Sequence, residues 1–81
     1  MRVVYAKRFL ESYADAPPAI QRAVDRRIAF LLQNLRHPSL RAKKYDEAQD
    51  IWQARGNGGW RFYFKIKGDA YHLVDLMPHP K

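Results

Sequence analysis

The sequence of 81 residues contains no cysteine. A disulfide framework, a thiolate metal site and a cysteine nucleophile are therefore excluded, nothing argues for an oxidising compartment, and we expect a cytoplasmic protein. The sequence also lacks the run of about 20 apolar residues that crosses a bilayer. Its first residues, "MRVVYAKRFLESYADAPP", are too charged and too short in apolar run for a signal peptide. We therefore expect an unprocessed, soluble chain with no membrane partner.

Acidic residues are scarce as well: eight Asp and Glu stand against fifteen Lys and Arg, which gives a net charge of +7. This excess favours a polyanionic partner such as nucleic acid, an acidic protein segment or a membrane surface. The alternative is that the charge serves solubility alone. Hydrophobic residues make up 47% of the chain, with two Trp, five Tyr and four Phe. We expect a single domain over residues 1–81 with a small, aromatic-rich core.

The order of predicted elements indicates an α+β fold. Residues 2–6 alternate as in a strand, and "KRFLESYAD" has the apolar spacing of a short helix. A second helix opens at Pro18 and stops near Arg36, because His37 precedes Pro38. "PSLRAKKYDEAQD" has neither period, and we interpret it as a connecting loop. The strands "IWQAR", "WRFYFKI" and "AYHLVDLM" then form a three-strand antiparallel meander, and the helices pack on one face of this small sheet.

The turn "GNGG" decides which side chains meet across the first hairpin. A loop of two or four residues would mix charged and aromatic residues on both faces. A three-residue loop, 57–59, separates the faces, and its glycines suit the left-handed residue that such loops need. We therefore predict the odd register, which places Arg55 opposite Arg61, Gln53 opposite Tyr63, Ala54 opposite Phe62 and Trp52 opposite Phe64.

This register brings two guanidinium groups face to face, although like charges directly opposite destabilise a sheet. An anionic ligand held between Arg55 and Arg61 would relieve the repulsion, and the planar fork of arginine matches a phosphate. The alternative is that both arginines extend into solvent, or pair with Asp46, Glu47 or Asp50 from the preceding segment.

The segments "IWQARGNGGWRFYFKI" and "LMPHPK" resemble the RelE/ParE superfamily of bacterial toxin–antitoxin toxins, and in particular its RelE-like mRNA interferases. The resemblance covers nearly the whole chain in element order, while its specific part is confined to these two segments. It implies cleavage of mRNA in the ribosomal A site, without a metal or other cofactor, by attack of the ribose 2′-hydroxyl on the neighbouring phosphate. It also implies a cognate antitoxin as partner, which lies across the basic face or adds to the edge of the sheet.

The resemblance also implies roles for particular residues. Arg61 of "WRFYF" matches the arginine that stabilises the transition-state phosphate, and Arg55 matches a basic residue on the strand before the turn. Gln53 stands where a second lysine is often found, so this part of the family pattern is missing. His79 and Lys81 are the candidates for the polar or basic residue after the last strand. Many relatives continue into a segment with a catalytic tyrosine, and its absence here leaves the general base open.

The chemistry of 2′-hydroxyl attack needs a proton acceptor, a proton donor and positive charge at the phosphate. Arg55 and Arg61 suit the last role, since arginine stays protonated. His79 is the natural proton shuttle, with an ordinary pKa of about 6.5, unless it is only a frayed tail residue. Lys81 would need a strongly lowered pKa to serve. Three dispersed histidines without ligand spacing give no case for a metal.

Other polar residues are candidates for RNA binding. Lys43 and Lys44, with Arg41 close by, either position phosphates or belong to a self-neutralised loop with its carboxylates. Tyr63 either stacks on a base or shields the hairpin, and Lys65 follows it on the arginine face.

Three functions remain open on the sequence. The first is a ribosome-dependent endoribonuclease toxin that acts on mRNA. The second is a ParE-like inhibitor of DNA gyrase, and the third is a basic RNA- or ribosome-binding module without catalysis. Steep salt dependence is expected in either RNA case.

Overall fold

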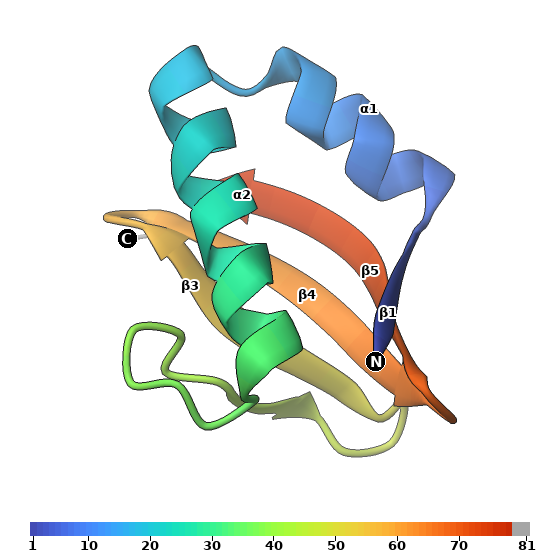
Figure 1. Ribbon diagram of the computed structural model, residues 1–81. Helices are drawn as coiled ribbons and strands as arrows, with labels where there is room; N and C mark the ends of the chain where they lie inside the picture. Colours follow the sequence, from blue (N-terminus) through green and yellow to red (C-terminus); the bar gives the residue numbers. More distant parts are fainter. Residues whose placement is uncertain (79–81) are drawn as a thin grey trace.

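The computed structural model describes residues 1–78, and the predicted site residues His79 and Lys81 lie outside this range. Two helices and five strands follow one another in the chain (Figure 1). They are β1 (Arg2–Tyr5), α1 (Lys7–Asp15), α2 (Pro18–Gln33), β2 (Lys43–Asp46), β3 (Ile51–Asn57), β4 (Trp60–Lys67) and β5 (Ala70–Pro78). The α+β prediction is confirmed.

The five strands form one sheet in the order β1-β5-β4-β3-β2. The meander of β3, β4 and β5 is antiparallel as predicted, but β1 runs parallel to β5, so the sheet is mixed. The prediction of a loop over "PSLRAKKYDEAQD" is wrong in part, because β2 lies within it and pairs with β3. Three of the four β2 side chains are charged, so the sequence shows no apolar alternation that would predict a strand. The strand forms through its pairing with β3.

Both helices begin where the sequence predicts. Pro18 opens α2, where its missing N–H leaves no hydrogen bond unmade. The helix ends at Gln33 rather than near Arg36, because Asn34 adopts extended backbone and its side-chain oxygen accepts a 2.9 Å hydrogen bond from the Arg36 N–H. Neither helix of the described residues has the length and apolar character needed to cross a membrane.

Both helices cover the same face of the sheet, as Figure 1 shows, and the core lies between them and the strands. Helix side chains such as Phe9 and Leu31 pack there against Phe62 and Phe64 of β4, all at most 1% exposed. By strand alternation, the side chains between Phe62 and Phe64 and on either side of them point to the opposite face. Neither α1 nor α2 covers this face in the described part of the chain (Figure 1). Most of the described residues singled out for function line this open face, namely Lys43, Gln53, Arg55, Arg61, Tyr63 and Lys65.

Candidate functional site

The β3–β4 hairpin has the predicted register. Arg55 lies opposite Arg61 and Gln53 opposite Tyr63, so the charged and apolar residues separate onto two faces. The connection differs from the predicted three-residue loop: Asn57 pairs with Trp60, and the register shifts between Arg55 and Asn57. Gly56 is thus the extra residue of a bulge on β3, beside a two-residue turn of Gly58 and Gly59. The bulge and the turn together give the same pairs as the predicted three-residue loop.

Arg55 and Arg61 line a hollow of about 320 Å³ on the open face, together with Arg41, Lys43 and Gln53. We call this the arginine hollow. Its cationic residues come from three segments, because Lys43 of β2 pairs with Gln53 of β3, and β3 pairs in turn with β4. The convergence of Arg55 and Arg61 on one side of the sheet therefore extends to two further cations.

The connection between α2 and β2 places Arg41 in the hollow. Leu40 is fully buried, and its carbonyl accepts a 2.7 Å hydrogen bond from the Arg55 backbone N–H. The Arg27 side chain holds the same connection by donating to the Ser39 carbonyl. Arg41 follows with a left-handed backbone, φ 47°. The sequence marked Arg41 only as a neighbour of Lys43, since its direction depends on the burial of Leu40.

No carboxylate of residues 1–78 lines the arginine hollow. Arg55 Nε is buried there without a hydrogen-bond partner among these residues. Repulsion from Arg41, then burial, then repulsion from Arg61 and Arg27 lowers the pKa of Arg55. Positive charge is thus concentrated at a place where the described part of the chain offers it no counterion.

Arg61 is oriented by the turn that precedes it. Its Nη1 donates to the carbonyls of Gly58 at 3.1 Å and Trp60 at 3.0 Å. These two contacts fix one edge of the guanidinium group, and its other nitrogens make no hydrogen bond within residues 1–78. A guanidinium group held in this way is preorganised to bind an anion.

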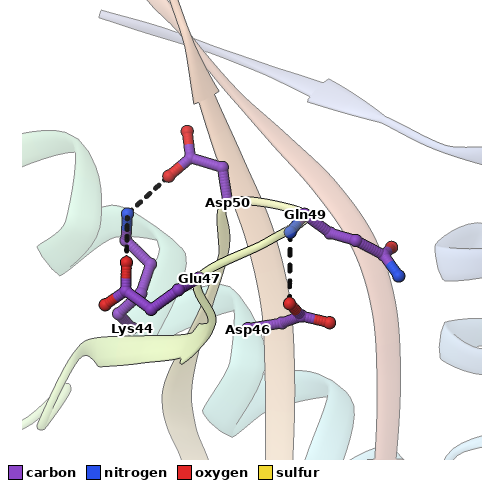
Figure 2. Close-up of polar contacts among 5 residues, drawn as sticks. All are labelled: Lys44, Asp46, Glu47, Gln49 and Asp50. Atoms are coloured by element: carbon purple, nitrogen blue, oxygen red, sulfur yellow. Dashed lines mark hydrogen bonds and ion pairs between the residues drawn. The ribbon is translucent and has the colours of Figure 1, made fainter.

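The two adjacent lysines of β2 point to opposite faces. Lys43 lines the arginine hollow. Lys44 lies 5.1 Å from the centre of the Trp52 ring. It pairs with Asp50 and, at 4.0 Å, with Glu47, as Figure 2 shows. The structure therefore separates the two predicted phosphate contacts, and Lys44 is neutralised within its own segment.

The same segment accounts for the carboxylates that the sequence offered as partners for Arg55 and Arg61. Asp50 and Glu47 contact Lys44, and an Asp46 oxygen accepts the Gln49 backbone N–H at 3.1 Å (Figure 2). None of the ion pairs within residues 1–78 involves an arginine of the hollow.

Tyr63 and Lys65 share the open face with Arg61 but line a neighbouring hollow. Tyr63 is 6% exposed, and burial raises the pKa of its hydroxyl. The arginine hollow itself contains no histidine or carboxylate of residues 1–78. It is therefore suited to bind a phosphate and stabilise negative charge on it, while a proton acceptor must come from outside this set.

No protein-family model matches the sequence, and no curated protein matches it. Solved structures match in fold. The chain is similar to a YoeB/ParE toxin from Agrobacterium tumefaciens, with a TM-score of 0.82 and 12% identity over 99% of this chain and 100% of that chain. It is also similar to YoeB from Staphylococcus aureus, with a TM-score of 0.81 and 9% identity over 99% and 98%. A chain of the RelB–RelE antitoxin–toxin complex from Methanococcus jannaschii matches with a TM-score of 0.74 and 19% identity over 93% and 88%.

The chain thus shares the fold of these YoeB and RelE toxin structures.

Proposed function

We propose that this protein is the toxin of a type II toxin–antitoxin system, a RelE-like endoribonuclease that cleaves mRNA on the ribosome. The observation that carries the proposal is the convergence of Arg41, Lys43, Arg55 and Arg61 around one open hollow that no carboxylate of residues 1–78 lines. Such a site attracts a phosphodiester and stabilises the charge that develops during its cleavage. The fold shared with RelE and YoeB toxins supports the same function.

In the proposed reaction the ribose 2′-hydroxyl attacks the adjacent phosphorus, the bond to the 5′-oxygen breaks, and a 2′,3′-cyclic phosphate forms. Arg61 and Arg55 hold the non-bridging oxygens as negative charge builds up. One proton leaves the 2′-hydroxyl and one reaches the departing 5′-oxygen. We assign this proton transfer to His79, with Lys81 as the second candidate, and no metal or other cofactor takes part.

The proposal includes a partner and a location. Solved relatives occur as RelB–RelE and YoeB–YefM toxin–antitoxin complexes. We infer that this chain, acting as a single cytoplasmic domain, likewise has a cognate antitoxin, and that mRNA on the ribosome is its target.

The test adds the purified protein to translating ribosomes and maps cuts in the bound mRNA by primer extension. The wild-type protein is expected to cut, and Arg61→Ala is expected to cut about 100- to 1,000-fold more slowly, as when one preorganised donor is removed. Lys67→Ala is the matched control, because it removes one positive charge from an exposed position outside the arginine hollow. Circular dichroism verifies that both variants fold.

Each outcome decides between the candidates. Uncut mRNA with the wild-type protein would overturn the nuclease. RNA that binds and stays intact would point to the non-catalytic RNA-binding module instead. Loss of DNA supercoiling by gyrase in a parallel assay would point to the ParE-like inhibitor.

A further inference from the structure

A second hollow, of about 350 Å³, lies beside the arginine hollow on the open face of the sheet. Two cross-strand pairs join the hollows, Gln53 with Tyr63 and Arg61 with Met77. Gln53 and Arg61 line the arginine hollow, and their partners Tyr63 and Met77 line the second hollow. We call the second one the tyrosine hollow. Its wall includes Tyr45, Ile51, Tyr63 and Met77, with Lys65 and Asp75 among its polar residues.

The two tyrosines differ in burial although their rings touch. Their centroids are 5.0 Å apart at an interplanar angle of 61°, which is an edge-to-face contact. Tyr63 is 6% exposed, whereas Tyr45 is 61% exposed. Tyr45 is thus a large aromatic side chain that the fold supports from one side and leaves open to solvent on the other.

The polar residues of the tyrosine hollow are also held in place. Asp75 accepts hydrogen bonds from its neighbour's backbone, the Leu76 N–H at 2.8 Å, and from the Ser12 hydroxyl at 3.2 Å, and it pairs with Arg8 at 3.1 Å. Helix α1 therefore fixes this carboxylate at the wall. Lys65 supplies a donor on the same face, so the hollow offers both an acceptor and a donor beside an aromatic surface.

We propose that the tyrosine hollow binds the nucleobase of the nucleotide whose phosphate occupies the arginine hollow. This inference rests on the proposed function and deepens it. Arg61 and Tyr63 are alternate residues of β4, so their side chains leave the same face about 7 Å apart, a spacing comparable with one nucleotide. Aromatic surfaces beside cationic grooves bind single-stranded nucleic acid in this way, by stacking next to the phosphate contacts. The unstacked base of a single strand is the occupant that fits.

The experiment measures binding of fluorescent RNA hexamers at low salt by anisotropy, with one abasic site moved through the hexamer in turn. Tyr45→Leu is expected to weaken binding of the intact hexamer about 5- to 100-fold, the range observed when one stacked base loses its aromatic partner. Tyr45→Phe keeps the ring and is expected to bind like the wild-type protein. Tyr5→Leu is the matched control, because Tyr5 is also an exposed tyrosine, 45%, but lines neither of these two hollows.

At one position of the hexamer the abasic site is expected to weaken wild-type binding by a similar factor and to have no further effect on Tyr45→Leu. Independent effects of Tyr45→Leu and the abasic site at every position would overturn the inference. So would a polyglutamate peptide that binds with the same dependence on Tyr45, because the hollow would then dock a protein segment. If no hexamer binds, the nucleobase assignment fails, while cleavage on the ribosome keeps its own test.

Discussion

The two faces of the β3–β4 hairpin use their side chains in opposite ways. On the helix-covered face, Phe62 and Phe64 are fully buried in the core. On the open face, Arg55 and Arg61 lie opposite each other, and in the described residues neither has a carboxylate partner. Elsewhere the fold does pair its cations, as with Arg8 and Asp75. We therefore expect the apolar face to supply stability and the paired arginines to oppose it, and in the proposed function these arginines serve a ligand.

The largest effect is expected on the apolar face. Phe62→Ala removes a fully buried aromatic side chain at the centre of the sheet and should lower the free energy of unfolding by about 3–5 kcal/mol. Urea unfolding followed by circular dichroism measures the change. Arg61→Ala in the same assay should leave the protein folded. Similar losses from both substitutions would contradict the division of labour between the faces.

The turn that sets the two faces apart gives a smaller effect. Gly58 has φ 49°, and a Cβ there would meet no atom within 4 Å, so Gly58→Ala is disfavoured by backbone conformation alone. We expect a loss of about 1–2 kcal/mol in the free energy of unfolding. Gly59→Ala is the control, since its side chain also enters open space and its φ is not left-handed. Equal costs at both positions would refute the backbone account.

The sequence predicts the separation of the faces because strand alternation is local: residues 60–67 alternate strictly, and only one parity of the turn keeps both faces uniform. It does not predict how that parity is reached, since a bulge beside a two-residue turn and a three-residue loop produce the same pairs. Helix starts follow from Pro18 and from apolar spacing, whereas the end of α2 depends on the side chain of Asn34.

The sequence predicts that Arg55 and Arg61 meet on the hairpin, and it offers Lys43 as a phosphate contact with Arg41 close by. It does not predict that Arg41 and Lys43 join this pair while Lys44 points away. Strand β2 is an edge strand without an apolar pattern, and its orientation comes from pairing with β3 and from burial of Leu40. These contacts join separate segments, as Lys43 with Gln53 and Leu40 with Arg55, and no period within one segment encodes them.

Inorganic phosphate should stabilise the folded protein by binding at the arginine hollow, on the cationic face alone. A ligand that binds only the native state adds about 0.4 kcal/mol to the free energy of unfolding when its concentration equals Kd, and more above it. Thermal unfolding at increasing phosphate, with ionic strength held constant by chloride, measures this. Lys67→Ala should keep the response and Arg61→Ala should lose most of it. Equal stabilisation of both variants would mean that phosphate acts as a general salt and does not bind at the arginine hollow.

The smallest expected effect is a rise in stability on replacement of Arg55, and the direction of the change is what tests the comparison. Arg55→Met keeps a long apolar stem and removes an Nε that is buried without a partner among residues 1–78. It also ends the repulsion from Arg41 and Arg61 that lowers the pKa of Arg55. Its urea midpoint without phosphate should therefore rise slightly above that of the wild-type protein, because like charges held together oppose folding. Arg2→Met is the control: Arg2 forms an exposed pair with Asp69, and its loss should leave the midpoint unchanged. If Arg55→Met gains stability and loses stabilisation by phosphate, Arg55 serves binding at the expense of folding. A lower urea midpoint would instead mean that Arg55 stabilises the fold. The arginine face and the core face would then both contribute to stability.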